Sequence, residues 1–479
     1  MIQEISTIFA KTKILGTLGP ATSSKEAIIN LIDVGIDGVR LNFSHGNYDF
    51  YKGLFATIEE ACKEKSSPLA VLLDLQGPKI RIGDLVRPEI EILTGDRIEI
   101  TSEKILGDEK KISTSYSPLP QDSQINEIIL IDDGLLRLRI VEKTENSVIC
   151  EIENGGTLKP KKGMNLPGMK LSTPSVTDKD LQDLEFALGF HIDFVALSFV
   201  RQARDITMLR QWMKERGHDK PIIAKIEKRE AVDNFDAILK VADGIMVARG
   251  DLGVELNPED VPIIQKMIIK KCNAVGKMVI TATQMLESMI LNPIPTRAEA
   301  SDVANAVWDG TDVVMLSAET SVGKYPYKTV TVMNNILLKA ESNPQNRGGI
   351  EYAIPGSTEE NLFDATNHAI CSIANQTNAV AIVALTHQGR AAKRLSKFRP
   401  KARIIAVSDS FDTINNLCLK WGVTSLYYHH ISKEGFVIDD IKQMILESGH
   451  VQKGDLVLFT AGAPYSEKSR LSWMKFEEM

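Results

Sequence analysis

The chain has 479 residues, of which 43% are hydrophobic and 25% are charged, and it carries a net charge of −7 with a pI near 5.8. This composition is typical of a soluble globular protein, and the length predicts two to four domains. The negative balance excludes a global attraction to nucleic acid or to an anionic membrane, so we expect neither as a partner. No stretch resembles a signal peptide or a membrane span, and the five cysteines are scattered with no Cys-x-x-Cys pair. These features favour a cytoplasmic protein with reduced thiols.

Eight short apolar runs recur along residues 12–317, most of them followed by a stretch of helical periodicity. In chain order they are TKILGT, DGVRLN, LAVLLD, DFVALS, PIIAKIE, DGIMVA, KMVITA and DVVMLS. Buried parallel strands give near-continuous apolar runs, and alternation of strand with helix indicates a parallel sheet. Eight such units predict an α/β fold with a closed (β/α)₈ TIM barrel.

The interval between the third and fourth runs is too long for one helix. It begins at Gly77-Pro78 and contains alternating segments separated by hairpin-type turns such as DDG and ENGG. We therefore predict a small β-barrel inserted over residues 77–171, within a catalytic barrel formed by residues 1–76 and 172–343. Because the insert leaves at the carboxyl end of the third strand, where barrel active sites lie, we expect it to act as a lid.

A Pro- and Gly-containing linker precedes a third region over residues 358–479. Its apolar runs AVAIVALT, ARIIAVS, VTSLYY and DLVLFTAG read as strands, with a basic helix, RAAKRLSKF, between the first two. This pattern predicts a separate open α/β domain.

Charged residues follow the fifth and sixth runs at positions suited to catalysis. Lys225 and Glu227 are two residues apart and share one face of a strand, although a pair of this kind is often only a salt bridge. Asp251 follows Arg249 and Gly250 at the start of a predicted helix, where it could equally be an N-cap. Glu227 and Asp251 together are suitable oxygen ligands for Mg²⁺ or Mn²⁺.

Other strand ends add polar groups to the same rim of the barrel. Arg40 suits phosphate recognition through its rigid guanidinium, whereas a lone histidine or a Gly-Pro turn is more often structural. The remaining groups are Thr17, Pro20, Asn42, Ser44, His45, Thr283, Gln284, Ser317 and Glu319. Cations, two carboxylates and hydroxyls under one lid indicate chemistry on a polyanionic substrate with a divalent metal.

Several motifs in order resemble those of the pyruvate kinase family, over roughly the first three-quarters of the chain. They are RLNFSHG, DLQGPKIR, KKGMNLPG, AKIE, MVARGDLGVE, TATQMLESM, PTRAEASDVANAV and LSAETSVGKYP. The resemblance implies phosphoryl transfer from phosphoenolpyruvate to ADP, giving pyruvate and ATP in the last step of glycolysis. It also implies a Mg²⁺ or Mn²⁺ cofactor and a homotetramer.

The resemblance assigns roles to matching residues. Arg40 and Lys225 would contact the transferring phosphoryl group, and Glu227 and Asp251 would hold the metal. The substrate carboxylate would sit on the backbone of Gly250 and Asp251, helped by Thr283. The proton-delivery region for the enolate would comprise Thr283, Ser317 and Glu319. The nucleotide side would comprise Arg81 and Lys162, in or beside the lid, with Thr17, Pro20, Asn42, Ser44 and His45.

Lys79 departs from the commonest pattern of the family, which has glutamate at this position. In that pattern a K⁺ ion is held by groups matching Asn42, Ser44, Asp74 and the carbonyl of the next residue, here Leu75. A lysine ammonium could fill the same position, as in potassium-independent members of the family. We therefore predict that K⁺ is not required. The alternative is that Lys79 is a solvated surface lysine.

The loop ALTHQGRAAKRL in the last region matches the family's effector loop only in part. Thr386, Gly389 and Arg390 are retained, but His387, Gln388 and Ala391 stand where hydroxyl residues are frequent. A helix start beside Arg390 could bind a phosphorylated effector. The sequence leaves open whether the loop binds such an effector or is only structural.

Two other functions compete with the kinase. A Mg²⁺-dependent carbon–carbon lyase of the phosphoenolpyruvate/pyruvate barrel group would also place a Glu/Asp-bound metal at a barrel rim, but it has no evident need for the insert. A catalytically silent metabolite-binding regulator would not need Lys225, Glu227, Asp251 and Thr283 together.

Overall fold

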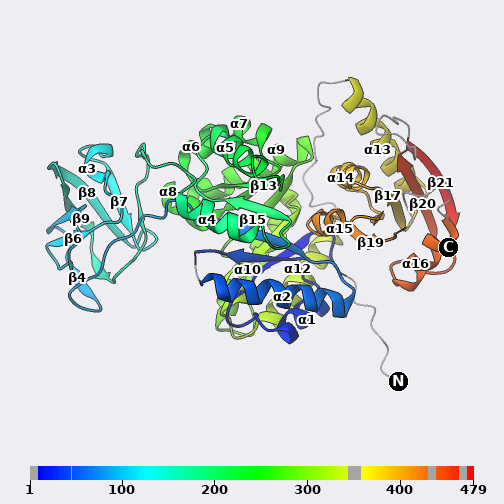
Figure 1. The fold of residues 1–479 in the computed structure, drawn as a ribbon, viewed down its shortest axis with the longest axis horizontal. Coiled ribbons are helices and arrows are strands. Elements are labelled where there is room, and N and C mark those ends of the chain that lie inside the picture. Colours follow the sequence, from blue (N-terminus) through cyan, green and yellow to red (C-terminus); the bar gives the residue numbers. More distant parts are fainter. Residues whose placement is uncertain (1–8, 45, 344–357, 430–437, 463–471) are drawn as a thin grey trace.

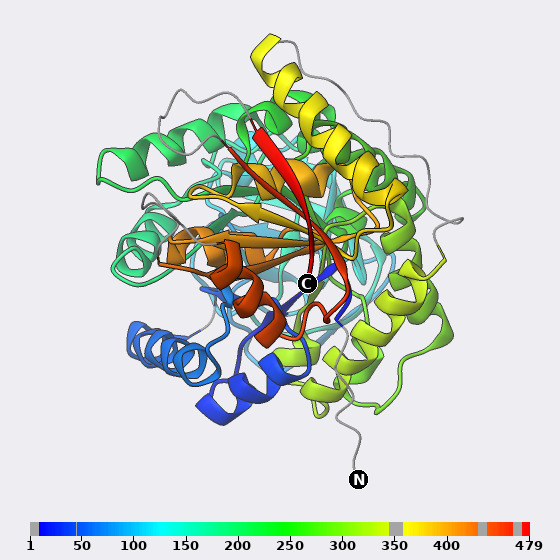
Figure 2. The same ribbon diagram turned by 90° about the vertical axis from the view of Figure 1, so that its right-hand side faces the viewer.

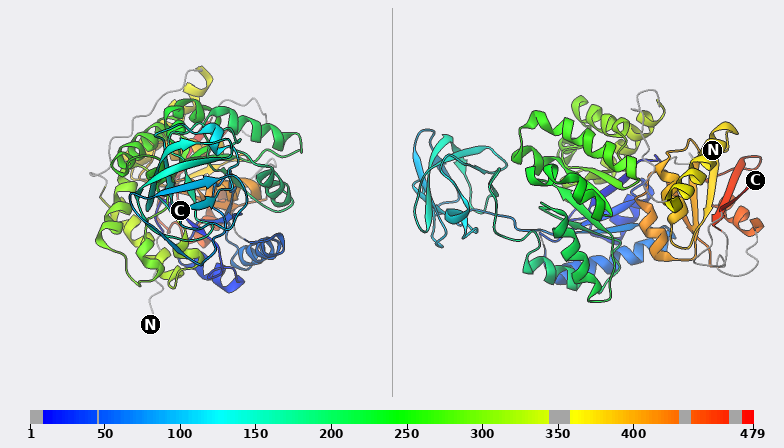
Figure 3. Two further views of the ribbon diagram at one scale, coloured as in Figure 1. Left: turned by 90° about the vertical axis from the view of Figure 1, so that its left-hand side faces the viewer. Right: turned by 90° about the horizontal axis from the view of Figure 1, so that it is seen from above.

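The computed structural model describes residues 9–44, 46–343, 358–429, 438–462 and 472–479. Three units lie in a row, with a β-rich insert at one end, a barrel in the middle and an α/β unit at the other end (Figure 1). The view from above shows the same order (Figure 3). None of the helices in these ranges is both long and apolar enough to cross a membrane.

Eight parallel strands close the central barrel, in the order β1-β16-β15-β14-β13-β12-β3-β2. They coincide with the eight apolar runs: β1 (Lys13–Thr17), β2 (Gly38–Asn42), β3 (Ala70–Asp74), β12 (Phe194–Leu197), β13 (Ile222–Ile226), β14 (Gly244–Ala248), β15 (Met278–Ala282) and β16 (Val313–Leu316). The inward side chains, among them Leu15, Leu72 and Met246, fill the interior as a packed core. The predicted TIM barrel is confirmed.

Helices surround the barrel and bury their apolar faces against the strands. Several begin at a side-chain cap, such as the capping boxes of Thr177 with Asp180 and of Thr296 with Glu299. The helices are α1 (Lys25–Asp33), α2 (Tyr48–Lys65), α4 (Asp178–Ala187), α5 (Ala203–Lys214), α6 (Arg229–Asp233), α7 (Phe235–Val241), α8 (Arg249–Glu255), α9 (Val261–Val275), α10 (Arg297–Asp309), α11 (Ala318–Ser321) and α12 (Pro326–Glu341). Short 3₁₀ turns, η1 (Pro258–Asp260) and η2 (Glu287–Ile290), complete this layer.

A repeating aspartate closes the amino end of the barrel. The residue directly before β2, β12, β14 and β16 is Asp in each case, and its carboxylate accepts the N–H of a residue in the preceding barrel strand. The acceptor–donor pairs are Asp37 with Ile14, Asp193 with Val71, Asp243 with Ile222 and Asp312 with Val279, each at 2.8 Å. These four carboxylates fix the register between neighbouring strands, and they occur before every second strand of the barrel.

The insert has its own core, formed by side chains between Ile80 and Met169. One sheet has the order β11-β7-β8-β9-β5-β6, and β4 pairs with β10 in a second. The elements are β4 (Ile90–Ile92), β5 (Arg97–Thr101), β6 (Lys111–Ser113), α3 (Leu119–Asp122), β7 (Ile128–Ile131), β8 (Leu136–Lys143), β9 (Ser147–Asn154), β10 (Gly156–Leu158) and β11 (Met164–Asn165). The alternating pattern predicted in this interval is therefore present as an all-β module.

The third unit is an α/β sheet in the order β19-β18-β17-β20-β21. Its elements are α13 (Thr358–Gln376), β17 (Ala381–Leu385), α14 (Arg390–Lys397), β18 (Arg403–Ser408), α15 (Phe411–Cys418), β19 (Val423–Tyr427), α16 (Ile438–Glu447), β20 (Leu456–Gly462) and β21 (Ser472–Glu478). The sequence predicted four of these strands but not the antiparallel edge strand β21. The predicted linker at residues 344–357 lies outside the described residues.

This third unit packs on the amino end of the barrel, opposite the insert (Figures 1 and 2). Cys418 and Leu419 join the core that fills the barrel base. Arg399 is buried and donates to Asp312 at 2.5 Å and to the carbonyl of Gly310 at 3.0 Å. One end of the barrel is thus sealed by the third unit, and the carboxyl end faces the insert.

Candidate active site

Lys225, at the end of β13, lies at the centre of a buried cluster of charges. Its Nζ is 2.7 Å from Ser198 Oγ, 2.9 Å from Glu227 Oε1 and 3.3 Å from Asp74 Oδ1. Burial by itself lowers the pKa of Lys225, but the carboxylates of Asp74 and Glu227 outweigh it and raise that pKa above its ordinary value. The ammonium is therefore a fixed positive charge at physiological pH.

Asp74, at the end of β3, orients a second cation beside Lys225. Arg40 Nε donates to Asp74 Oδ2 at 2.7 Å, and Arg40 Nη1 donates to the hydroxyl of Thr17 at 3.1 Å. That hydroxyl in turn donates to the carbonyl of Leu316 at 3.0 Å. Although burial raises the pKa of Asp74, the charges of Lys225 and Arg40 bring it below its ordinary value. An ionised Asp74 thus holds two cations at the rim.

Glu227 and Asp251 form the predicted carboxylate pair. Glu227 is buried and accepts the N–H of Phe199 at 2.6 Å, whereas Asp251 lies partly exposed in the first turn of α8. Burial raises the pKa of Glu227; the Lys225 charge lowers it and the Asp251 charge raises it again. The repulsion between the two carboxylates is of the kind that a divalent cation removes.

The carboxylates available for a metal are few. In the part of the chain that the structure describes, no group of three or more His, Cys, Asp or Glu side chains is suited to hold a metal ion. Two protein carboxylates with further oxygens from water and substrate are a usual arrangement for Mg²⁺. The residues present therefore fit a divalent ion that is completed by a substrate.

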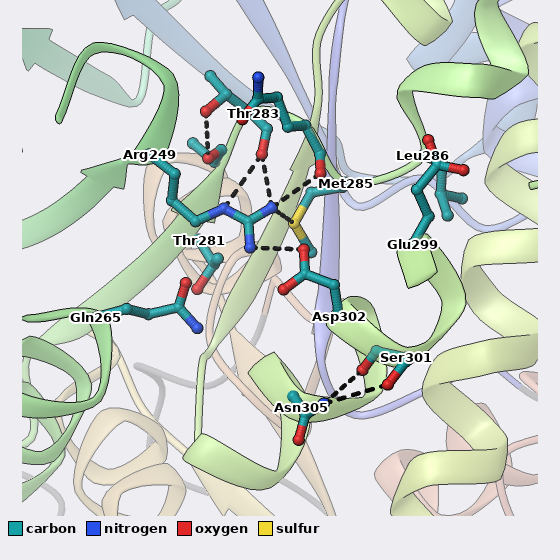
Figure 4. A network of polar contacts seen from close by, with 12 residues as sticks. Arg249, Gln265, Thr281, Thr283, Met285, Leu286, Glu299, Ser301, Asp302 and Asn305 are labelled. Atoms are coloured by element: carbon teal, nitrogen blue, oxygen red, sulfur yellow. Dashed lines mark hydrogen bonds and ion pairs between the residues drawn. The ribbon is translucent and has the colours of Figure 1, made fainter. Parts of the chain in front are cut away.

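The start of α8 is fixed against the turn after β15. The N–H of Gly250 donates to Thr283 Oγ1 at 2.8 Å. Thr283 and Gln284 have φ of 66° and 53°, in the left-handed region that non-glycine residues rarely adopt. The guanidinium of Arg249 donates to the carbonyls of Thr283 and Gln284, at 2.7 and 3.0 Å, and to Asp302 at 2.6 Å (Figure 4). Arg249 thus stabilises a strained turn that presents Thr283 to Gly250.

Ser317 and Glu319 follow β16 on the same rim. Glu319 is buried and accepts the N–H groups of Ser317 and Leu286 at 2.7 and 3.2 Å. Burial raises the pKa of Glu319 above its ordinary value, while the backbone hydrogen bonds oppose this. The hydroxyl of Ser317 is buried and has no hydrogen-bond partner among the described residues. This hydroxyl can therefore donate to a group that enters the site.

The predicted nucleotide-side cations lie on the insert and contact other parts of it. Arg81 Nη1 donates to the carbonyl of Lys161 at 3.0 Å, and Lys162 pairs with Asp132 at 2.8 Å. On the barrel side, Pro20 is exposed and the side chain of Asn42 accepts the N–H of Ser44 at 3.3 Å. His45 lies outside the described residues.

Lys79 lies in the first linker to the insert, and its side chain is exposed. Its N–H donates to the carbonyl of Gly77 at 2.8 Å, but its ammonium contacts no hydrogen-bonding or charged partner in the described ranges. The structure therefore does not bring the ammonium to Asn42 and Ser44. Leu75 is buried, and its carbonyl accepts the hydroxyl of Ser198 at 2.7 Å.

The predicted effector residues Thr386, Gly389 and Arg390 lie at the start of α14, where Gly389 is the N-cap with φ of 72°. His387 Nδ1 is 2.6 Å from Asp409 Oδ1, so a carboxylate lies beside the loop. That carboxylate opposes the binding of an anion at the loop.

Sequence reasoning did not find Ser198, the Phe199 N–H or the Arg249 clamp as parts of the site. Ser198 is the last residue of the fourth apolar run, as Ser317 is the last residue of the eighth, so its position was a usable signal. The N–H of Phe199 and the carbonyls that Arg249 contacts are backbone groups, and side-chain patterns do not reveal them.

Comparison with known proteins places this geometry in a family. The family model for the barrel domain of pyruvate kinase matches residues 9–330, and the model for the pyruvate kinase alpha/beta domain matches residues 364–475. Pyruvate kinases of Geobacillus stearothermophilus and Staphylococcus aureus (strain MRSA252) are 43% and 42% identical, over 97% of this chain and 80% of each relative. A crystal structure of a pyruvate kinase from Cryptosporidium parvum superposes with a TM-score of 0.89 at 38% identity, covering 98% of this chain and 96% of that one. The chain belongs to the pyruvate kinase family.

Proposed function

We propose that the carboxyl end of the barrel transfers the phosphoryl group of phosphoenolpyruvate to ADP through the residues described above. The observation that carries this assignment is the buried set of Lys225, Arg40, Asp74 and Glu227, which places two fixed cations beside a carboxylate at one rim. Phosphoryl transfer depends on positioning and on stabilising charge at the phosphoryl oxygens. Lys225 and Arg40 supply that charge. Mg²⁺ or Mn²⁺ bound by Glu227 and Asp251 would add further positive charge toward the same oxygens.

The carboxylate of phosphoenolpyruvate binds at the start of α8. The N–H groups of Gly250 and Asp251 lie in the first turn of α8, where they lack partners within the helix. In this structure the Gly250 N–H donates to Thr283 Oγ1 at 2.8 Å, so the substrate carboxylate would take over this donor. The enolate left after transfer needs a proton. The buried hydroxyl of Ser317, with Glu319 and Thr283 nearby on the rim, supports this region as the source.

ADP binds between the barrel rim and the insert, with Arg81 and Lys162 as its cations and Thr17, Pro20, Asn42, Ser44 and His45 on the barrel side. Both cations belong to the insert, whose separate core supports a unit that moves as one body. Closure over ADP would exclude water and suppress hydrolysis. We place the unit boundaries at residues 1–76 with 172–343, 77–171 and 358–479.

Formation of ATP from ADP and phosphoenolpyruvate, coupled to reduction of the pyruvate formed, tests this function. The lyase alternative predicts carbon–carbon cleavage with no ATP, and nothing in the comparisons favours it. Pyruvate without ATP, or neither product, would contradict the kinase assignment.

We propose that the enzyme works without K⁺, because Lys79 carries a positive charge in the segment next to Asp74. In this structure the ammonium is exposed, so the proposal requires it to move toward Asn42 and Ser44 when the lid closes. Turnover in a tetramethylammonium buffer should change by less than about twofold when KCl is added. Strong activation by KCl would contradict the proposal, and Lys79→Glu should create a K⁺ requirement.

We also propose a cytoplasmic homotetramer, with an allosteric effector site at the start of α14. Exposed apolar side chains on α9 and on β21, including Ile263, Met474 and Phe476, support burial against further copies. Sedimentation analysis tests the tetramer. Titration with phosphorylated sugars and AMP tests the effector site; if neither activity nor melting temperature moves, the loop of Thr386, Gly389 and Arg390 is structural.

A further inference from the structure

The four residues Ser198–Arg201, which we call the β12 turn, lie between the lid linkers and the reacting groups. The turn follows β12 directly. Its first two residues hold the central charges: Ser198 Oγ accepts from Lys225 Nζ at 2.7 Å, and the N–H of Phe199 donates to Glu227 Oε2 at 2.6 Å. A shift of this turn would move both the catalytic lysine and a proposed metal carboxylate.

The last residue of the β12 turn holds the chain that returns from the insert. Arg201 Nη1 donates to the carbonyl of Leu171 at 2.6 Å, and Nη2 donates to the carbonyl of Thr173 at 2.7 Å. Its Nε donates to Ser175 Oγ at 3.3 Å. One guanidinium therefore binds three acceptors along a five-residue segment of linker.

The outgoing linker touches the same turn. Ser198 Oγ donates to the carbonyl of Leu75, and Gly77 lies against Phe199. A Cβ added at Gly77 would be 2.8 Å from Phe199 Cδ2 and 3.2 Å from Ser198 Cβ, and Gly77 has φ of 66°, so only glycine fits this approach. Both chains that carry the lid thus contact one short turn.

The backbone of the β12 turn is strained. Phe199 has φ of 53°, in the left-handed region, where a bulky residue is a genuine outlier. Such a conformation persists only where surrounding contacts impose it, and these outliers cluster at functional positions. Here the imposing contacts come from Glu227 on one side and from the lid linkers on the other.

We infer that Arg201 is a positioning residue that couples the lid linkers, through the β12 turn, to Lys225 and Glu227. When the returning linker moves, the guanidinium carries the displacement to the turn, and the hydrogen bonds of Ser198 and Phe199 carry it to the reacting groups. The inference rests on the roles proposed above for Lys225 and Glu227, and it adds a route by which lid position sets their geometry.

The test compares Arg201→Met with Arg210→Met in the full-length enzyme. Arg210, on α5, is the matched control, because it binds a carbonyl (Val241, 3.0 Å) and a carboxylate (Asp243, 2.7 Å) near the amino end of the barrel. Two readouts are taken: kcat for ATP formation, and the Kd of Mn²⁺ from the electron paramagnetic resonance of free Mn²⁺. We expect Arg201→Met to lower kcat and to raise the Kd of Mn²⁺, each by about tenfold, which is the size of effect seen when residues that orient metal ligands are replaced.

Values for Arg201→Met within about twofold of wild type would overturn the coupling. Equal losses in Arg210→Met would also overturn it. If Arg201→Met does not fold, Arg201→Lys replaces it, since one ammonium cannot reach all three acceptors. The Arg201→Lys enzyme should show smaller losses in both kcat and Mn²⁺ affinity. Wild-type values of both would overturn the inference.

A double-mutant cycle separates coupling from a merely structural role. If the turn transmits the displacement, Ser198→Ala and Arg201→Met act on one pathway, and the double variant should lose little more kcat than the worse single variant. If the fold-losses of kcat in the two single variants multiply in the double variant, the two residues act independently, and the coupling is contradicted. A wild-type enzyme that makes no ATP overturns the proposed function itself; normal ATP formation with an unaffected Arg201→Met overturns only the coupling.

Discussion

At the amino end of the barrel, Asp37, Asp193, Asp243 and Asp312 each accept a backbone N–H from a neighbouring strand, whereas at the carboxyl end Asp74 and Glu227 face Lys225. The first set occurs before every second strand, which indicates that these aspartates stabilise the barrel. The second set follows no repeat, and it concentrates opposite charges where the insert faces the barrel.

The same residue types thus perform two tasks, and the end of the barrel at which they lie tells them apart. A carboxylate satisfied by a strand N–H stabilises the fold, and its loss should reduce the free energy of unfolding. Pairing with a buried cation does not separate the two sets, because Asp37 pairs with Lys13 and Asp312 pairs with Arg399. Asp74 and Glu227 differ in that both converge on one lysine, Lys225, at the rim that faces the insert. Substitutions at the two ends should therefore separate activity from stability.

The largest effect is expected for Glu227→Gln at the carboxyl end. The amide is isosteric but carries no charge, so the proposed metal pair loses one of its two negative charges and Lys225 loses one charged partner. We expect kcat/KM to fall by about 10³-fold, or about 4 kcal/mol of transition-state stabilisation, and Mn²⁺ binding to weaken. The urea midpoint should fall less than it does for Asp312→Ala, because Lys225 keeps Asp74 as a charged partner and the amide oxygen can still accept the N–H of Phe199. Retained Mn²⁺ affinity and turnover would show that Glu227 is not a metal ligand.

Asp312→Ala at the amino end should give the opposite result. Asp312 is bonded to the buried guanidinium of Arg399 and to the N–H of Val279. Removal of one partner of a buried ion pair costs about 3 kcal/mol, so the urea midpoint should fall while kcat of the folded enzyme stays within about twofold. A large loss of kcat with an unchanged midpoint would contradict the division between the two ends.

Thr283→Ala removes the hydroxyl that contacts the N–H of Gly250 but keeps the strained turn that Arg249 holds. We expect the KM for phosphoenolpyruvate to rise by about tenfold, equivalent to one hydrogen bond to a charged group of about 1.4 kcal/mol. The KM for ADP should not move. Equal changes in both KM values would mean that the substitution disturbs the rim generally.

The smallest expected effect is the pH dependence of stability that arises from His191, which lies beside Asp193 at the amino end of the barrel. Interaction with the carboxylate of Asp193, whose Oδ1 is 3.1 Å from His191 Nε2, raises the pKa of His191 above its ordinary value, while burial opposes the shift. Because the folded pKa is raised, the stabilisation is fully present below the unfolded value near 6.5 and is lost as pH rises through the folded value. The side chain is 44% exposed, so we expect at most about 0.5 kcal/mol.

Melting temperatures of wild type and His191→Gln, compared from pH 5.5 to 9, measure this effect. The wild-type advantage should be largest at pH 5.5 and should disappear at pH 9. An advantage that grows with pH would show that His191 is stabilising in its neutral form.

The strands and the lid insert could be predicted from sequence because burial leaves its pattern in the residues themselves. Lys225 and Glu227 followed from strand periodicity, and Asp251 from its place at a helix start. The aspartate before every second barrel strand was a visible repeat that went unused. Edge strand β21 was missed because the segment SWMKFEE alternates poorly and needs β20 as its partner.

Other parts of the site depend on distances that sequence does not encode. The backbone is strained at Phe199 and Thr283, and side-chain patterns do not show this. Arg201 and Arg249 bind carbonyl groups of residues that lie tens of positions away in the sequence. The position of Lys79 depends on how the lid lies, and its exposure here follows from the path of the linker after Gly77.

Turnover of Lys225→Met in ATP formation from phosphoenolpyruvate and ADP tests the central claim most directly. Methionine keeps most of the side-chain volume but removes the buried ammonium. We expect kcat to fall by at least about 10³-fold, while the variant stays folded and still binds Mn²⁺. A Lys225→Met enzyme that makes ATP at near wild-type rates would contradict it.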